Sequence, residues 1–449
     1  MIACLFMVTG CVEEFEADLP DRDTHLLVVN GTICSNQLNK FQLTWSSPLN
    51  DKNLVFYGDG SDNYNYAYAE PVVGAKVTIC GTDGKEYRCT AQYGSDAGNY
   101  TCDLPELNPD VSYYVTIEYA DDIYQSTPEK PIYTPDIESF EYFQKDSLSN
   151  IDVLLTTAAP DDPDKITYFV WDYDETWEVR PTRTTTMFFD VKKREKKDVY
   201  NVQLYPKFGW KFGYNDNIIV ESTQHYAGGK LSKRRLLEIP RDDERIAWNY
   251  SNKVSQRAIS KAEYEYEMAC RQAGWEMGGL FTPQPSALPT NIRCLTSSKR
   301  VIGYVGCAQN VVTKRLYIEG SKISRVLPKP AMFIKLERCT LDECCQMVKH
   351  RYVLYKWYED SDQTRYGLIT YWGWLEDFDV REQGAITDKP EYMPPFGEEY
   401  HFEDSEYKYN YDYNDEEDDN IGDDFGYYDD GYYDDYYDTY SKSRRKHRN

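Results

Sequence analysis

Long apolar runs, basic character and known catalytic motifs are all missing from this sequence of 449 residues. After the first ten residues, no segment approaches the roughly 18 uncharged apolar residues of a membrane-spanning helix. The formal net charge of −26 argues against a nucleic-acid partner, because phosphate binding needs a basic face. The sequence contains no Gly-x-Ser-x-Gly, His-Glu-x-x-His or Gly-x-x-x-x-Gly-Lys-Ser/Thr motif. We therefore expect no enzymatic activity, no cofactor and no nucleic-acid partner.

Histidine is scarce and Cys-x-x-Cys pairs are absent, which makes a zinc site a poor interpretation of the cysteines. Of the 12 cysteines, Cys4 lies in the N-terminal leader and Cys11 is the one expected to be lipidated. The other ten are candidates for disulfides if the chain is exported. Cys89 and Cys102 flank a turn-rich stretch and can face each other across a hairpin, and Cys339 can pair with Cys344 or Cys345. The connectivity stays open, because spacing alone does not determine it.

The first twenty residues have the order of a lipoprotein leader. The run from Ile2 to Val8 is apolar, Thr9 and Gly10 are small, and Cys11 follows at once. This order resembles a bacterial lipobox, in which cleavage precedes a cysteine that then receives a diacylglycerol. No Lys or Arg precedes the apolar run, so the leader can be truncated at its start. The acidic residues after Cys11 also resemble the signal that sends lipoproteins of Bacteroidota to the outer cell surface.

Most of the negative charge lies in the C-terminal tail. Residues 398–438 contain 18 Asp and Glu against one Lys, and few aliphatic residues accompany them. Such a segment cannot bury enough apolar surface to offset its ordering entropy, so 396–449 is predicted to be disordered. Dense carboxylates can also hold Ca²⁺, although no intact Asp-x-Asn-x-Asp-Gly loop is present. The candidate ligands of such a Ca²⁺ ion are Asp412, Asp415, Glu416 and Asp418.

Short β-rich runs separated by Gly, Asn and Asp predict a mainly β protein. They begin with "LLVVNGTI" and continue through "AKVTICG" and "YYVTIEYA". Period-two patterning with turn residues at these intervals is typical of an antiparallel, immunoglobulin-like or transthyretin-like sandwich. The predicted organisation is a signal peptide at 1–10, an acidic linker at 11–24, a β-sandwich domain at 25–135, a larger β-rich domain at 136–395 and the tail at 396–449.

One helix is predicted within the larger domain, near 260–276. Ser260 begins it and Glu263 follows three residues later, the arrangement of a capping box. Tyr264, Met268 and Trp275 recur at helical spacing, and a stripe of this kind is usually core. Four tryptophans are candidate contact residues that we interpret as core, because aromatic residues dominate cores. These are Trp171, Trp177, Trp210 and Trp275.

The same region resembles a Bacteroidota lipoprotein family, domain of unknown function 4249. The family progression is "YEYW…GGIFDPQPS…GNI…VLGYF…R". Its places are held here by Tyr264–Tyr266, Gly278–Phe281, Pro283–Ser286, Asn291–Ile292, Gly303–Tyr304 and Arg315. The closing "TDKPEYMP" is also similar, so the resemblance extends from Cys11 to Pro395. Thr282 and Thr290 depart from the family's usual Asp and Gly.

The resemblance implies a surface lipoprotein that works with a TonB-dependent outer-membrane transporter; it does not imply a reaction. We expect an anchored outer-membrane protein, facing the cell exterior, that acts as a non-catalytic binding partner of such a transporter. The ligand, whether small molecule, glycan or peptide, is open. Two alternatives remain: a structural or adhesive surface protein, and a surface glycan hydrolase with two converging carboxylates.

Overall fold

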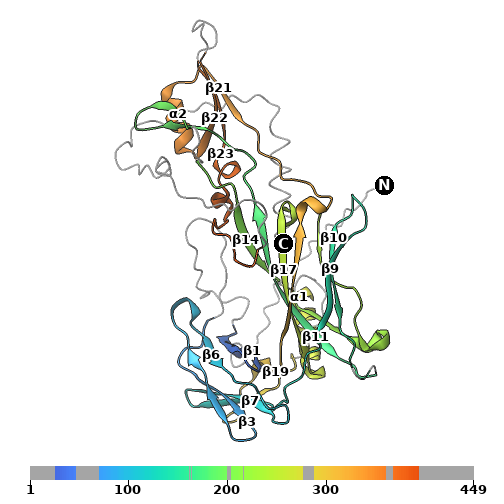
Figure 1. Ribbon diagram of the computed structural model, residues 1–449. Helices are drawn as coiled ribbons and strands as arrows, with labels where there is room; N and C mark the ends of the chain where they lie inside the picture. The colour runs from blue at the N-terminus through green and yellow to red at the C-terminus, as the bar shows by residue number, and fades with distance from the viewer. Residues whose placement is uncertain are drawn as a thin grey trace, which may run out of the picture. The chain divides into compact units, whose positions relative to one another are not determined.

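The computed structural model describes residues 26–46, 70–160, 162, 164–199, 204–215, 217–276, 288–359 and 368–393, and only the backbone of 273–276. These residues form two compact units. The first unit contains the described residues up to Thr184, those of 205–331 and those from Glu376 onward, and the second contains those of 185–204 and 332–375. The chain is mainly β, as the sequence predicts (Figure 1). No described helix is long and apolar enough to span a membrane.

The N-terminal sandwich of the first unit is built from two five-stranded sheets around one core. One sheet has the order β19-β1-β2-β6-β5, with bounds β1 Leu27–Cys34, β2 Leu38–Trp45, β5 Thr90–Ala91, β6 Asn99–Asp103 and β19 Val301–Ala308. The other has the order β18-β8-β7-β3-β4, with bounds β3 Lys76–Gly81, β4 Glu86–Arg88, β7 Tyr113–Tyr119, β8 Asp122–Ser126 and β18 Ile292–Cys294. β1 pairs with β19 in parallel, and the other strand pairs of these sheets are antiparallel.

Alternating burial explains why these segments form strands. Along β2, Phe41 and Leu43 enter the core while Lys40 and Gln42 face outward. Gly84 has a φ of +85° in the turn between β3 and β4, a conformation that glycine adopts without steric cost.

The N-terminal sandwich does not end at the expected boundary between 135 and 136. β18 and β19 come from residues 292–308, beyond the expected domain, and complete its two sheets. Figure 1 shows β1 and β19 side by side. The sequence did not predict this pairing, because a period-two pattern indicates that a segment is a strand but not which distant strand it pairs with.

The central sandwich of the first unit packs a three-stranded sheet against a five-stranded one. The smaller has the order β16-β10-β9, with bounds β9 Ile137–Gln144, β10 Ile151–Thr157 and β16 Arg234–Ile239. The larger has the order β14-β11-β17-β20, with β15 also paired to β11, and bounds β11 Tyr168–Val179, β14 Gly209–Tyr214, β15 Ile219–Ser222, β17 Asn249–Ile259 and β20 Val312–Glu319. Val153, Leu155, Trp171 and Val254 meet in the shared core.

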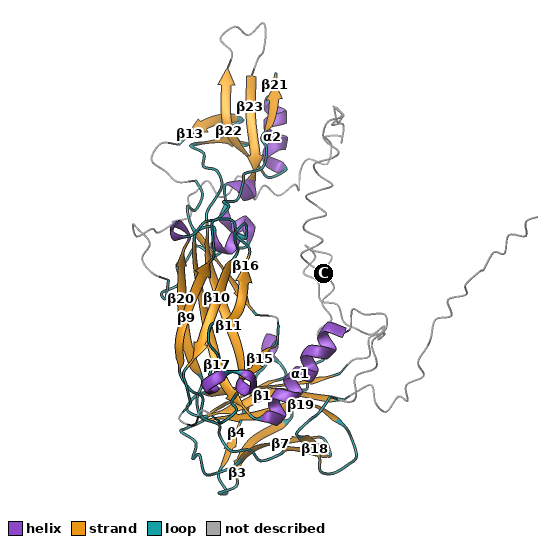
Figure 2. Cartoon of the chain, turned by 90° about the vertical axis from the view of Figure 1, so that its right-hand side faces the viewer, coloured by secondary structure: helices purple, strands orange, loops and turns teal. Residues whose placement is uncertain are grey.

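Helix α1, Lys261–Glu276, begins where the sequence predicts. Ser260 Oγ accepts the backbone N–H of Glu263 at 3.1 Å, which forms one half of the expected capping box. The carboxylate of Glu263 is directed to Arg257 rather than back to the helix start. Tyr264 and Met268 pack on a small apolar cluster with Val170 and Val220, and Figure 2 shows the helix beside β15 and β19.

The second unit combines a hairpin, a three-stranded sheet and a helix. The hairpin joins β12 Met187–Asp190 to β13 Glu195–Asp198, and the sheet has the order β21-β23-β22 with bounds β21 Ile334–Glu337, β22 Tyr352–Glu359 and β23 Leu368–Trp374. Helix α2, Leu341–Lys349, covers one face of this sheet. The prediction of a single helix was therefore wrong. Two and a half turns are too short for periodicity to separate a helix from a loop, but the capping box of Thr340 and Glu343 was readable.

Short 3-10 helices connect the strands at η2 Gly94–Asp96, η3 Thr223–His225, η4 Ala227–Gly229, η5 Glu244–Ile246, η6 Gly320–Lys322, η7 Leu375–Asp377 and η8 Val380–Gln383.

Candidate functional site

A charged cluster lies beneath α1, where strands of both sandwiches approach the helix. Arg257 on β17 forms an ion pair with Glu263 at 2.6 Å, and their side chains are 16% and 4% exposed. Burial alone would lower the pKa of Arg257, but the nearby carboxylates of Glu263, Glu267 and Asp172 together raise it. We call Arg257, Glu263, Glu267, Glu129 and Tyr304 the junction cluster.

Two further carboxylates of the junction cluster have perturbed pKa values. Burial raises the pKa of Glu267 to about 7, and the negative charge of Glu263 adds to this effect. Burial also raises the pKa of Glu129, although the hydroxyl of Tyr304 donates a hydrogen bond to its carboxylate and opposes the rise. Glu129 Oε2 is buried without a hydrogen-bond partner.

Two local features, the hydrogen bonds of Asn291 and the glycine at position 306, fix the position of β19. The side-chain amide of Asn291 donates to the carbonyl of Val305 and its oxygen accepts the Val305 N–H, both at 2.9 Å. A Cβ at Gly306 would lie 2.3 Å from Glu263 Oε2. Only glycine allows β19 to pass this close to the buried carboxylate.

The junction cluster links the two sandwiches of the first unit. Arg257 comes from the central sandwich, whereas Tyr304 on β19 and Glu129 after β8 come from the N-terminal one. Arg257 pairs with Glu263, and Tyr304 with Glu129. The hydroxyls of Ser260 and Tyr304, 3.2 Å apart, join the start of α1 to β19. The described residues contain no group of three or more His, Cys, Asp or Glu side chains that could hold a metal ion. The geometry is that of a structural junction.

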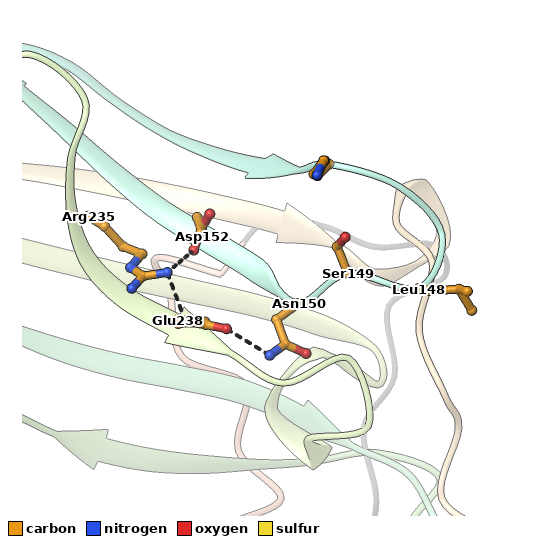
Figure 3. A pocket seen from close by; sticks show the side chains of 7 residues that line it. Leu148, Ser149, Asn150, Asp152, Arg235 and Glu238 are labelled. Carbon is orange, nitrogen blue, oxygen red and sulfur yellow. Dashed lines mark hydrogen bonds and ion pairs between the residues drawn. The ribbon is translucent and has the colours of Figure 1, made fainter.

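A pocket of about 330 Å³ lies at the β9–β10 turn and β16 (Figure 3). Arg235 Nη1 lies 3.2 Å from Asp152 Oδ1 and 2.9 Å from Glu238 Oε2, and Asn150 donates to Glu238 at 2.8 Å. Four polar side chains of the lining, those of Arg235, Asp152, Glu238 and Asn150, therefore satisfy one another. Ligand sites are usually lined mostly by apolar and aromatic groups, whereas Leu148 is the one apolar residue among the described residues that line this pocket.

A group of aromatic side chains lies on the second unit, on the sheet face turned away from α2. Register shows this placement: Leu354 and Trp372 pair and pack beneath α2, whereas Tyr371 pairs with Lys335 and Lys356 on the other face. We call Phe333, Tyr355, Tyr358 and Tyr371 the aromatic row.

Ring contacts connect the aromatic row. Phe333 stacks on Tyr355 with centroids 4.3 Å apart, and Tyr358 meets Tyr371 edge to face at 6.1 Å. Lys356 Nζ lies 5.2 Å from the centre of the Tyr355 ring. Tyr358 is 52% exposed although it is a large aromatic residue. The exposed Tyr358, together with the half-buried Tyr355 and Tyr371, offers an amphipathic contact surface.

Several residues singled out from the sequence lie outside the described residues: Cys11 and the Ca²⁺ candidates Asp412, Asp415, Glu416 and Asp418. The four disulfide candidates are described, as thiols. Cys339 and Cys344 have Sγ atoms 3.3 Å apart. Burial, with Cys102 close by, raises the pKa of Cys89. The proposed pairings stay predictions.

The interpretation of the tryptophans as core holds for Trp171, Trp177 and Trp210, each at most 9% exposed. The side chain of Trp275 lies outside the described residues.

Sequence reasoning missed both the junction cluster and the aromatic row. Arg257 lies at one of the half-buried positions of the strand β17, and nothing in the local sequence indicates that a helix covers it. The aromatic row had a readable signal: the aromatic-rich segments "YVLYKWYE" and "LITYWGW" are the two long strands of the second unit.

No curated protein matches the sequence. A crystal structure of a DUF4785 family protein from Legionella pneumophila is similar at 9% identity over 51% of this chain and 50% of that chain, with a TM-score of 0.16. The chain thus spans about half the length of that structure, and so low a score supports no inference. The family model described as domain of unknown function (DUF4249) matches residues 12–315, short of the expected limit at Pro395. This match covers more than half of the sequence, and the chain therefore belongs to the DUF4249 family.

Proposed function

We propose that this DUF4249 protein is a non-catalytic, lipid-anchored accessory protein of a TonB-dependent outer-membrane transporter, and that the aromatic row of the second unit is its contact surface. The observation that carries the proposal is an exposed tyrosine, Tyr358, in ring contact with the half-buried Tyr371 on a sheet face that α2 does not cover. Tyr supplies large, rigid contact area and a hydroxyl at low entropic cost.

The anchor supports the same function. Acylation of Cys11 and a second lipid-binding signal or chain would hold the folded units at the bilayer. Confinement to the membrane surface raises the effective concentration of the aromatic row near a transporter in that membrane. Modest contacts then suffice for capture.

Three of the buried carboxylates are paired with arginine, unlike Glu267 and Glu129, whose pKa values are raised. Glu175 pairs with Arg245, Glu263 with Arg257, and Asp379 with Arg381. Carboxylates held by arginine are poor general acids, because the positive charge favours their ionised form.

Co-purification tests the proposal. The tagged chain, with its leader, is recovered from detergent-solubilised outer membrane, and bound proteins are identified by mass spectrometry. We expect the wild type to retain a TonB-dependent transporter and the double variant Tyr358→Ala/Tyr371→Ala to lose it. The matched control is Tyr93→Ala/Tyr133→Ala, which removes tyrosines that are 78% and 67% exposed on the first unit. Equal recovery by both double variants would refute the contact surface.

The anchor needs a separate measurement. Replacement of Cys11 by Ala, with the leader retained, should move the protein from the membrane to the soluble fraction. Persistence in the membrane fraction would refute lipid anchoring without affecting the contact surface.

A further inference from the structure

The two cysteines at the beginning of α2 lie against each other in the core of the second unit. Cys339 precedes the helix cap and Cys344 lies within the helix, and their Sγ atoms are 3.3 Å apart. Their exposed fractions are 7% and 0%. Both side chains pack with Val348, Leu354 and Trp372.

The backbone on both sides of this pair is fixed. The N–H of Cys339 donates to the carbonyl of Leu368 at 2.9 Å, which ties the segment to β23. Thr340 and Glu343 form a complete capping box, which fixes the first turn of α2. A disulfide needs its sulfurs about 2.05 Å apart, so a small side-chain rotation closes the remaining gap.

Cys345 faces a different environment. It is half-buried, and the charged neighbours that act on its thiol are Arg194, Asp342 and Lys349. Consecutive helical residues point about 100° apart, so Cys344 and Cys345 cannot both face Cys339.

We propose that Cys339 and Cys344 form an intramolecular disulfide in the exported protein and that Cys345 remains a thiol. The bond joins the residue before the cap of α2 to its second turn and fastens the helix to the end of β21. This inference is independent of the aromatic row and of the transporter.

The order of the chemistry follows from the two thiols. The hydrogen bond between the two thiols lowers the pKa of Cys339, whereas this interaction and burial raise the pKa of Cys344. The Cys339 thiolate therefore attacks the disulfide of an external thiol–disulfide oxidant, forms a mixed disulfide and releases one thiolate. Cys344 then loses its proton and attacks the Cys339 sulfur, and the second oxidant thiolate leaves. Two protein thiols are oxidised, and one oxidant disulfide is reduced to two thiols.

Peptide mapping of the full chain tests the proposal. The exported wild type is alkylated with iodoacetamide without reduction and cut with trypsin and a protease specific for glutamate. Trypsin releases Cys339–Lys349, and cleavage after Glu343 separates Cys339 from the two other cysteines. We expect the two fragments to remain joined, two hydrogens lighter than the sum of the separate thiol peptides, with a single alkyl group on Cys345.

Alkylation of all three cysteines would overturn the proposal, as would a link that leaves Cys344 alkylated. The variant Cys345→Ser should keep the joined fragments, whereas Cys344→Ser should release them. If Cys344→Ser fails to fold, the position of the label in the wild type still decides between Cys344 and Cys345.

Discussion

Several charged side chains buried in the first unit are accompanied by opposite charges. Glu175 meets Arg245 at 2.9 Å, and Arg257 meets Glu263 at 2.6 Å. Loss of one partner leaves an uncompensated charge with little water around it, which costs far more than the pair contributes. At the scale of single residues, the junction cluster is therefore sensitive to substitution.

Replacement of Arg257 by Met should destabilise the first unit by about 3–5 kcal/mol, because Glu263 loses its buried counter-charge. The measurement is the free energy of unfolding in urea. Lys261→Met is the matched control: its pair with Glu265 has side chains that are 71% and 59% exposed, so the loss should stay below about 1 kcal/mol. Similar losses for both variants would contradict the role given to Arg257.

Glu267 should make stability fall as the pH rises. Its pKa is about 7 in the folded protein against an ordinary 4.5, so between these values the folded state holds a proton that the unfolded chain has lost. The stabilisation is complete below pH 4.5 and is lost as the pH rises through 7. Glu267→Gln should remove this dependence.

The check is the free energy of unfolding at several pH values. The advantage of Glu267→Gln over the wild type should grow from about pH 5 to about pH 8. Glu265→Gln, on the exposed side of the same helix, should leave the slope unchanged. If the free energy of unfolding of Glu267→Gln still falls with pH as in the wild type, another group causes that dependence. Glu129 is then the first candidate.

At the scale of elements, the register of the β5–β6 hairpin determines how Cys89 and Cys102 lie relative to each other. Thr90 lies opposite Thr101, so the next pair outward is Cys89 opposite Cys102. The N–H of Gln92 donates to Asn99 at 2.8 Å, and alternation along an antiparallel ladder then makes Cys89 and Cys102 a pair without mutual backbone bonds. Side chains approach most closely at such pairs.

A disulfide between Cys89 and Cys102 should form under oxidising conditions and stabilise the N-terminal sandwich by about 2–3 kcal/mol. Urea unfolding of the first unit with and without reductant should show this difference in the wild type, and the difference should be absent from that transition in Cys102→Ser. Cys80→Ser should respond to reductant as the wild type does, because the Cys80 thiol contacts Thr116 rather than another cysteine.

Elements were easier to predict than their partners. The capping pattern at Ser260 located α1, and alternation located strands such as β2 and β7. The partner of Glu263 and the paired strand of β1 depend on contacts between residues far apart in sequence, which local patterns do not encode. The aromatic row was not predicted as a contact surface, because the pattern of a strand does not show which of its faces a helix will cover.

At the scale of the whole molecule, the two units have separate hydrophobic cores. We therefore expect them to unfold in separate transitions. Trp372 is fully buried in the core of the second unit, and Leu155 is fully buried in the central sandwich of the first. Each truncation to Ala should cost about 2–5 kcal/mol in its own unit. Calorimetry should show Trp372→Ala lowering one transition and Leu155→Ala lowering another. A single transition shifted by both variants would show that the units unfold together.

The parallel pairing of β1 with β19 also constrains how the protein can be made. A polypeptide emerges from the ribosome with its N-terminus first, so β1 is released long before residues 301–308. Until then the flank of β1 that β19 will occupy is an open sheet edge, which invites pairing with other chains. On the proposed export route, crossing the membrane unfolded, with assembly only after most of the chain has crossed, would avoid that hazard. Shortened chains that stop before Val301 should aggregate rather than mature.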